Sequence, residues 1–242
     1  MTTPGDDPSM ATSTDKGIAV VVGARGGIGS ALVGAAEASG RYRHVLSLSR
    51  SSEPALDVEN EASVEAAAIR AAACGDIRLC LVATGLLHGE GIRPEKAIRD
   101  IDPAALARSF SVNAIGPALV MKHILPRLPR RGRSVLAVLS AKVGSIGDNR
   151  LGGWYAYRAS KAALNQLVRT AAIELARHRP EALCVAIHPG TVDTRLSSPF
   201  AKAGLAVADS ESAAVSILAC LDRLTASDSG GFFDRTGERL PW

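Results

Sequence analysis

Aromatic residues, cysteines and long apolar runs are all scarce in this chain. Aromatic side chains make up 4% of the 242 residues, which leaves little surface on which nucleic-acid bases could stack. No uninterrupted apolar run approaches the roughly 18 residues that a bilayer-spanning helix needs, and residues 1–15 lack the apolar centre of a signal peptide. We therefore expect a cytoplasmic protein without nucleic-acid or membrane partners.

The four cysteines are separated from one another and from the five histidines. They form no CxxC pair, and no histidine stands at metal-ligand spacing from them. Cys80 and Cys184 fall inside apolar, strand-like runs, where a thiol behaves as a small hydrophobic side chain. The sequence therefore predicts buried structural thiols in a reducing compartment and no metal site.

Charge is nearly balanced, with 28 Lys and Arg against 24 Asp and Glu, a net charge of +4. The basic residues are scattered except for one cluster, at Arg127, Arg130, Arg131 and Arg133. This cluster lies between an apolar helical pattern and an apolar strand pattern, and no aromatic residue interleaves it. We interpret it as a solvated connecting loop rather than a nucleic-acid patch.

Hydrophobic residues make up 47% of the chain, enough for a substantial core. Short apolar runs alternate with longer Ala- and Leu-rich stretches of helical period. The predicted strands cover residues 17–22, 43–49, 77–83, 134–139, 183–187 and 231–233. The predicted helices cover 28–39, 61–73, 154–177 and 210–224, with one or two more in 103–125.

This alternation predicts an α/β fold, a doubly wound parallel sheet of the Rossmann type with helices on both faces. No linker divides the chain, so we expect a single domain over residues 16–242, after a disordered tail at residues 1–15. In such sheets ligands bind beyond the carboxyl ends of the strands. The residues that follow each predicted strand are therefore the candidate site.

A glycine-rich turn follows the first predicted strand. Gly23, Gly27 and Gly29 have the spacing GxxxGxG directly before a helix. A glycine lacks the Cβ atom, which allows a tight turn and a close approach to a phosphate. The helix then offers free N–H groups and the positive end of its dipole to an anion. The turn predicts a pyrophosphate-binding site.

The end of the second predicted strand indicates which dinucleotide is bound. An NAD-binding fold usually has an acidic residue there, which bonds the ribose 2′-hydroxyl. This chain has Leu48-Ser49-Arg50 instead, without a carboxylate to repel a 2′-phosphate. Arg50, and Arg25 within the glycine turn, can pair with that phosphate. We predict that NADP(H) is preferred over NAD(H).

The longest predicted helix opens with a tyrosine and a lysine four residues apart, Tyr157 and Lys161. This spacing places both side chains on one face of the helix. A free phenol, with a pKa near ~10, is a poor acid–base catalyst at neutral pH. A neighbouring ammonium group favours the phenolate and lowers that pKa. The pair therefore predicts acid–base chemistry.

Four motifs occur together in one order. They are the glycine turn, Asn113-Ala-Ile-Gly116, the Tyr157–Lys161 pair and Pro189-Gly-Thr-Val-Asp-Thr194. Their combination resembles the short-chain dehydrogenase/reductase family, over nearly the whole chain from about residue 16 to residue 242. Residues 141–165 and 232–242 look like the C-factor-like, carbonyl-reductase-like branch of that family.

The resemblance implies a role for each matching position. Tyr157 matches the general acid/base, Lys161 the lysine that holds the nicotinamide ribose, and Asn113 an asparagine that supports a water-linked proton relay. Asp57 matches the residue that bonds the adenine amino group. The residues expected to bind the cofactor, from the turn, the charge argument and the resemblance together, are Gly23, Arg25, Gly27, Ile28, Gly29, Arg50, Asp57, Val58, Ala83, Thr84, Gly85, Tyr157, Lys161, Pro189, Gly190, Val192 and Thr194.

Two stretches depart from the family's pattern. Val82-Ala-Thr-Gly85 stands where the family usually has Asn-Asn-Ala-Gly. The family's catalytic serine, three residues before a glycine, is Ala141 here, before Gly144. Three explanations are open: Ser140 supplies the hydroxyl, Ser145 supplies it, or the site lacks that donor. We favour Ser140. Losing one such donor typically costs about two to three powers of ten in rate.

Two functions follow from these motifs. The first is an NADP(H)-dependent oxidoreductase that interconverts a carbonyl and an alcohol, with Tyr157 as general acid/base. The alternative is a catalytically weak nucleotide-binding regulatory or signalling protein of the same fold, which Ala141 favours and the Tyr157–Lys161–Asn113 set disfavours. The expected partners are a small carbonyl or alcohol substrate and further copies of the chain, as a homodimer or homotetramer. Trp154 and residues 194–205 are expected to form an apolar lid or packing contacts.

Overall fold

A computed structural model describes residues 16–89, 91–194, 196 and 207–242. The predicted disordered tail, residues 1–15, lies outside the described residues. Within them, six strands form one parallel sheet in the order β2-β1-β3-β4-β5-β6. The strands are β1 (Ile18–Val22), β2 (His44–Leu48), β3 (Ile77–Val82), β4 (Ser134–Leu139), β5 (Ala182–His188) and β6 (Phe232–Asp234).

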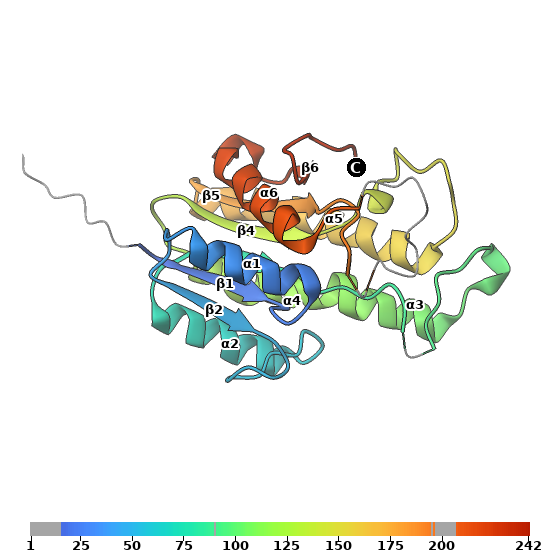
Figure 1. The fold of residues 1–242 in the computed structure, drawn as a ribbon, viewed down its shortest axis with the longest axis horizontal. Coiled ribbons are helices and arrows are strands. Elements are labelled where there is room, and N and C mark those ends of the chain that lie inside the picture. Colours follow the sequence, from blue (N-terminus) through green and yellow to red (C-terminus); the bar gives the residue numbers. More distant parts are fainter. Residues whose placement is uncertain (1–15, 90, 195, 197–206) are drawn as a thin grey trace, which may run out of the picture.

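Helices cover both faces of this sheet, as the sequence predicts (Figure 1). The helices α1 (Gly27–Ala38) and α6 (Ser210–Arg223) pack side by side on one face. The other face carries α2 (Glu61–Cys74), α4 (Gly116–Ile124) and α5 (Tyr155–His178). The fold is therefore a single doubly wound domain of the Rossmann type.

Two hydrophobic cores, one on each face, hold these layers together. Alternate residues of β1 point to opposite sides of the sheet. Ile18, Val20 and Val22 join the core under α2, α4 and α5, while Ala19 and Val21 join the core under α1 and α6. All five residues are buried, which explains why β1 reads as a continuous apolar run rather than an alternating one.

The stretch predicted as one or two helices, 103–125, is one continuous helical run with a wide turn inside it. The helix α3 (Pro103–Phe110) passes into a π-helical segment, Ser111–Ile115, and then into α4. By length and composition alone the run Pro103–Arg127 could cross a membrane, a test that core helices of soluble proteins also pass. In the fold, α3 contacts α5, and α4 contacts both α2 and α5.

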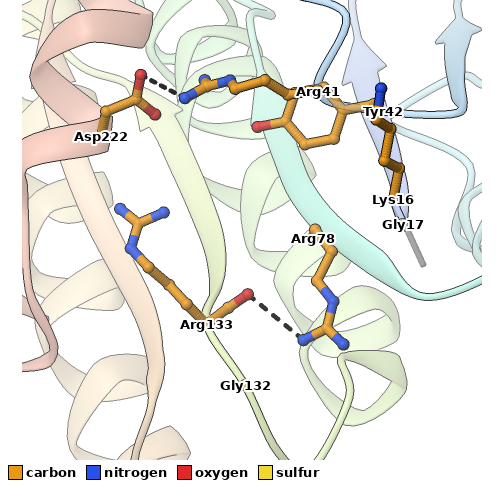
Figure 2. A pocket seen from close by; sticks show the side chains of 8 residues that line it. All are labelled: Lys16, Gly17, Arg41, Tyr42, Arg78, Gly132, Arg133 and Asp222. Carbon is orange, nitrogen blue, oxygen red and sulfur yellow. Dashed lines mark hydrogen bonds and ion pairs between the residues drawn. The ribbon is translucent and has the colours of Figure 1, made fainter. Parts of the chain in front are cut away.

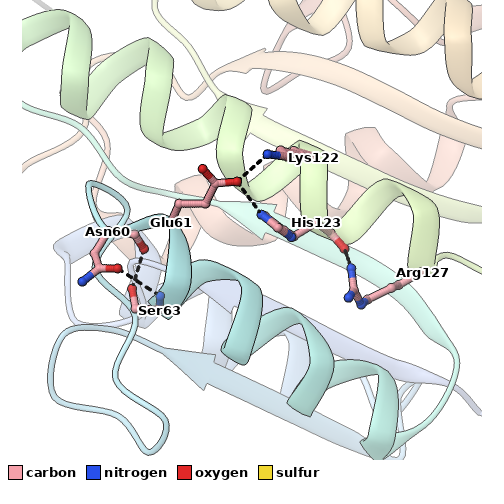
Figure 3. Close-up of polar contacts among 6 residues, drawn as sticks. All are labelled: Asn60, Glu61, Ser63, Lys122, His123 and Arg127. Carbon is pink, nitrogen blue, oxygen red and sulfur yellow. Dashed lines mark hydrogen bonds and ion pairs between the residues drawn. The ribbon is translucent and has the colours of Figure 1, made fainter.

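Polar contacts fix α2 against α4 (Figure 3). Asn60 caps α2, because its side chain accepts a hydrogen bond from the N–H of Ser63. Glu61, the first residue of α2, accepts from Lys122 at 2.5 Å and contacts His123 at 3.1 Å. These two partners on α4 hold the pKa of the Glu61 carboxyl below its ordinary value. These contacts link the start of α2 to the last turn of α4.

A shallow hollow lies at the amino ends of the strands (Figure 2). Arg41 pairs there with Asp222 at 2.5 Å. Arg78 donates to the main-chain oxygens of Arg131 and Arg133, and Arg133 donates to the carbonyls that end α6, at Leu221 and Leu224. These arginines thus connect neighbouring segments at the amino ends of the strands.

Candidate active site

A cavity of about 1000 Å³ lies at the opposite end of the sheet, beyond the carboxyl ends of the strands. It is located at the point where strand order reverses, between β1 and β3, the position at which doubly wound folds bind ligands. The predicted site residues that line it are Gly23, Arg25, Gly27, Ile28, Arg50, Asp57, Val58, Ala83, Thr84, Gly85, Ser140, Tyr157, Lys161, Pro189 and Thr194.

The glycine turn needs its glycines for space. Gly23 has a φ of +83°, and a Cβ there would lie 3.0 Å from the Ala83 backbone. A Cβ on Gly29 would lie 2.1 Å from the Gly23 carbonyl oxygen, so the turn needs a glycine there although Gly29 does not line the cavity. A Cβ on Gly27 would lie 2.8 Å from Thr194. Because the glycines have no Cβ atoms, backbone N–H groups remain at the cavity wall.

The N-terminus of α1 differs from those of α2, α3 and α6. The first residue before it, Gly26, offers no side-chain cap, whereas α2, α3 and α6 are capped by Asn60, Asp102 and Asp209. No partner among the described residues accepts from the N–H groups of residues 27–29. An uncapped helix start that faces a cavity can bind an anion through these groups and the helix dipole.

A second unpaired donor lies across from this turn. The Oγ1 atom of Thr84 is buried and has no hydrogen-bond partner among the described residues. Thr84 follows β3 and lines the cavity beside Gly23. Buried hydroxyls normally have a partner. Together with the uncapped α1, this donor fits a cavity that holds a polar, anionic ligand such as a dinucleotide.

Two arginines stand where the sequence predicts contacts to a 2′-phosphate. Arg25 and Arg50 line the cavity from the glycine turn and from the end of β2. Arg25 donates to the hydroxyl of Ser51 at 3.1 Å, which brings the two segments together. Asp57 and Val58 also line the cavity. A Cβ on Gly116 would lie 2.8 Å from Val58, so the helix above packs closely on this wall.

Tyr157 and Lys161 lie on the first turns of α5 and face the cavity. The Lys161 Nζ atom is 5.8 Å from the centre of the Tyr157 ring and donates to the Leu139 carbonyl oxygen at 2.9 Å. Lys161 is buried, whereas Tyr157 is half-buried at the cavity wall. The ring of Trp154, edge-on at 6.3 Å between ring centres, packs against Tyr157.

The pKa values of this pair shift differently from the sequence-based expectation. Burial raises the pKa of Tyr157 to about 12 and lowers the pKa of Lys161 to about 8. The predicted lowering of the tyrosine pKa by the ammonium group is therefore wrong for this structure. The physical reason is that desolvation outweighs the attraction to an amine that is bonded to Leu139 rather than to the phenol.

Asn113 lies in the π-helical segment and is fully buried, so it does not line the cavity. Its Oδ1 accepts from the Leu86 N–H and its Nδ2 donates to the Leu86 carbonyl, both at 2.7 Å. Nδ2 also contacts the hydroxyls of Ser109 and Ser160. Asn113 thus fastens the loop after β3 to the catalytic side of the molecule. Its predicted role in a proton relay stays a prediction.

The two candidate serines have different positions. Ser140 lines the cavity beside Lys161, and its hydroxyl donates to Oδ1 of Asn165 at 2.6 Å. Ser145 is buried away from the cavity wall, and its hydroxyl accepts from the N–H of Asp148. A Cβ on Gly144 would lie 2.7 Å from Lys161, so the turn between these serines packs tightly on α5. Of the two, Ser140 lines the cavity and Ser145 does not, and the role of Ser140 as the donor stays a prediction.

Some residues near the site differ from the sequence prediction. Gly190 and Val192 do not line the cavity, and Val192 is buried. Of the predicted lid, Leu196 lines the cavity, whereas Phe200 and Leu205 lie outside the described residues. No group of three or more potential metal ligands lies together in the part of the chain that the structure describes.

Two site residues carry no sequence signal that could have identified them. Glu95 is buried, and its carboxylate accepts from the N–H of Ala156 at 3.2 Å, in the first turn of α5. Its main-chain oxygen accepts from the N–H of Trp154. Glu95 therefore caps α5, the helix that carries Tyr157. The side chain of Trp154, the residue before α5, makes no capping hydrogen bond. The other residue is Asn165, the partner of Ser140.

Comparisons with known proteins show the family of this chain. A family model described as enoyl-(acyl carrier protein) reductase matches residues 23–218. The C-signal protein of Myxococcus xanthus is 40% identical over 147 residues, 60% of this chain and 84% of that protein. A 1-hydroxy-2-glutathionyl-2-methyl-3-butene dehydrogenase of Rhodococcus sp. (strain AD45) is 31% identical over 190 residues, 78% of this chain and 80% of that one. The chain belongs to the short-chain dehydrogenase/reductase family and is an oxidoreductase of that family.

Solved structures share the fold. The carbonyl reductase Sniffer of D. melanogaster has a TM-score of 0.80 at 22% identity, with 94% of this chain and 99% of that chain covered. The NADPH-bound carbonyl reductase from chicken fatty liver has a TM-score of 0.80 at 25% identity, with 93% of this chain and 94% of that chain covered. The second structure holds a reduced nicotinamide dinucleotide.

Proposed function

We propose that the protein is an NADP(H)-dependent oxidoreductase that reduces an aldehyde or ketone, or oxidises the corresponding alcohol. One observation carries this proposal: a single cavity joins the uncapped glycine turn to the Tyr157–Lys161 pair. The relatives named as dehydrogenases and the NADPH-bound carbonyl reductase support it. Substrates of this class are small molecules that fit beside Tyr157.

The residues of the cavity fit a nicotinamide dinucleotide. The N–H groups of Gly27 and Ile28 would hold its pyrophosphate, and Arg25 and Arg50 would pair with a 2′-phosphate. Thr84 would donate its unpaired hydroxyl. When bound, the dinucleotide supplies or accepts a hydride, which is chemistry that protein side chains lack.

The chain's own part in the reaction is proton transfer and polarisation. Tyr157 donates its phenolic proton to the carbonyl oxygen in the reductive direction and accepts it in the oxidative direction. Its pKa of about 12 keeps it protonated at neutral pH, which suits the reductive direction. Ser140 polarises the same oxygen through its hydroxyl. Lys161 donates to Leu139 and holds the end of β4 beside Tyr157.

Spectrophotometry tests both the reaction and the cofactor preference. Oxidation of NADPH is followed with a panel of aldehydes, ketones and quinones, and the Michaelis constants for NADPH and NADH are compared. We expect turnover with some members of the panel and a KM for NADPH at least about tenfold below that for NADH, because a charge-assisted pair contributes about 1.5–3 kcal/mol. A clear NADH preference would contradict the proposed cofactor.

A second function, nucleotide-dependent signalling with little turnover, is favoured by one comparison. The C-signal protein is 40% identical to this chain over 147 residues, and Ala141 removes the usual catalytic hydroxyl. Isothermal titration with NADPH separates the two functions. Saturable binding without turnover on any carbonyl of the panel would favour signalling, and turnover on any of them would favour the enzyme.

We also propose that the protein is a homodimer or homotetramer. Three apolar side chains of the π-helical segment and α5 are solvent-exposed in one copy: Ile115 by 53%, Leu167 by 37% and Ile173 by 50%. A second copy packed against α5 would bury the exposed side chain that faces it. Light scattering with wild type and Ile173→Glu tests this, since the variant should shift the mass toward one chain of 25.1 kDa.

A further inference from the structure

The hydrogen bond that holds Ser140 leaves a buried donor unsatisfied. The Ser140 hydroxyl donates to Oδ1 of Asn165 at 2.6 Å, and both side chains are buried. The Nδ2 atom of the same amide has no partner among the described residues. Buried N–H groups without a partner are rarer in proteins than carbonyl oxygens with an unused lone pair. A different arrangement of this pair would remove the unsatisfied donor.

A half-turn of the Asn165 amide provides that arrangement. Turning the planar amide exchanges its oxygen and nitrogen with almost no change in shape. Nδ2 then donates to the Ser140 oxygen, and the serine proton is no longer bound to Asn165. Because Ser140 lines the cavity, this proton can point at a carbonyl oxygen there. With Oδ1 facing the serine, the serine proton is bonded to Asn165 and is not available to a carbonyl in the cavity.

We infer that Asn165 is a positioning residue for Ser140: its amide nitrogen holds the serine oxygen and so directs the serine proton to the substrate carbonyl. This inference rests on the proposed function, and it supplies the donor that Ala141 lacks. Tyr157, Lys161 and Asn165 are spaced by one helical turn each on α5 and form one stripe. Two members of the stripe hold the end of β4, Lys161 at Leu139 and Asn165 at Ser140.

Asn165→Asp tests the direction of the hydrogen bond, because an ionised carboxylate accepts and cannot donate. With NADPH and 4-nitrobenzaldehyde as the probe pair, we expect kcat at pH 8 to fall about 100-fold, as far as in Ser140→Ala. The KM for NADPH should change less than about threefold, because Asn165 does not line the cavity.

The pH profile of Asn165→Asp adds a readout that loss of packing would not produce. As pH falls toward 5, the buried carboxyl takes up a proton and can donate to Ser140 as the amide does. The kcat of the variant relative to wild type should therefore rise. A variant as active as wild type at pH 8, or one with a flat ratio across this range, would overturn the inference.

The double variant Ser140→Ala, Asn165→Asp shows whether Asn165 acts through the serine. If it does, the second substitution has no further effect once the hydroxyl is gone. Losses that multiply would contradict the inference. Two variants are the controls. Ser134→Ala removes a different buried hydroxyl, at the start of β4, and Gln166→Glu adds a charge at an exposed neighbour of Asn165. Both should stay within about twofold of wild type.

Neutron diffraction of the deuterated protein needs no turnover. We expect deuterium on Nδ2 of Asn165 facing Ser140, and the serine deuterium facing the cavity. A serine deuterium on Oδ1 of Asn165 would overturn the inference. This measurement separates the two proposals: a protein that reduces no carbonyl refutes the proposed function, while the positions of the deuterium atoms decide the role of Asn165 by themselves.

Discussion

The two ends of the sheet use their polar groups in opposite ways. At the amino ends of the strands, Arg41 pairs with Asp222 and Arg78 donates to the main-chain oxygen of Arg133 (Figure 2). Arg133 in turn donates to the main-chain oxygen of Leu221. At the carboxyl ends, the first N–H groups of α1 and the hydroxyl of Thr84 have no partner among the described residues. The first end is arranged for stability, and the second retains unpaired donors around one cavity.

This difference has an energetic meaning. A buried polar group without a partner costs about 1–3 kcal/mol, and burial of an ammonium group costs more unless it is paired. Lys161 at the cavity carries such a cost, as its lowered pKa records. Functional sites commonly lose stability in this way, and the rest of the fold offsets the loss. Substitutions at the two ends should therefore have opposite effects.

The largest expected effect is on catalysis. Tyr157→Phe removes the phenolic proton, and we expect kcat to fall about 1000-fold, within the range of general acid–base catalysis. Tyr42→Phe at the other end of the sheet, where the ring lies beside Arg41, should leave kcat unchanged. Steady-state kinetics with NADPH and a reducible carbonyl measure both. Undiminished turnover in Tyr157→Phe would refute the proposed mechanism.

The next effect is on cofactor choice. Arg50→Ala should raise the KM for NADPH about 10- to 100-fold and leave the KM for NADH unchanged, because only NADPH carries the 2′-phosphate. Arg130→Ala, an exposed arginine of the basic loop, is the matched control. Equal increases for both dinucleotides would mean that Arg50 supports the fold of the turn rather than the phosphate.

A smaller effect is expected on stability. Lys161 has a folded-state pKa of about 8, below its unfolded value near ~10.4. Between these two pH values the unfolded chain binds more protons than the folded chain. The stability of the wild-type protein therefore rises with pH in this range. Lys161→Met should raise the free energy of unfolding by about 1–2 kcal/mol at pH 7, after loss of the bond to Leu139. This gain should shrink as pH rises from 8 toward 10.

Arg133→Met at the other end is the matched test of that stability difference. It removes the Arg133 donor from the carbonyls of Leu221 and Leu224, of which Leu221 keeps the N–H of Leu224. We expect a loss of about 1 kcal/mol that does not depend on pH in this range. Urea unfolding at pH 7 and pH 9.5 compares the two variants. A loss of stability in Lys161→Met at pH 7 would contradict the comparison.

The smallest effects are expected at two helix starts. Asn60→Ala removes the cap of α2 and should cost about 1 kcal/mol, with NADPH affinity unchanged. Gly26→Ser offers α1 a cap and should change stability by only a few tenths of a kcal/mol, but it occupies N–H groups and should weaken NADPH binding several-fold. Thermal melts and titration calorimetry separate these outcomes. Unchanged NADPH affinity in Gly26→Ser would count against pyrophosphate binding at α1.

The sequence predicts the fold and the cavity wall well, since both follow from local patterns. Every predicted strand is present within two residues at each end, because buried parallel strands read as apolar runs between turns. The turn before α1 is predicted from its glycine spacing, which is also a local pattern. The tyrosine pKa is predicted wrongly, because burial and the bond from Lys161 to Leu139 depend on segments far apart in the chain.

Glu95 and Asn165 could not be predicted for a related reason. Glu95 lies in a loop without a motif, and its role arises only where that loop meets the start of α5. Asn165 shares the spacing of Tyr157 and Lys161, but only the contact with Ser140 gives it a meaning. Local pattern identifies residues that face a site, whereas contacts between distant segments decide what those residues do.

The π-helical segment Ser111–Ile115 limits where this chain tolerates changes in length. Each residue of an α-helix advances by about 100° around the axis, so an insertion or deletion between α3 and α4 that no wide turn absorbed would rotate α4 against α3 by that amount. Gly116 would then move off Val58, and Asn113 would lose Leu86. Insertions and deletions should therefore accumulate on either side of the run Pro103–Arg127 and be absent within it.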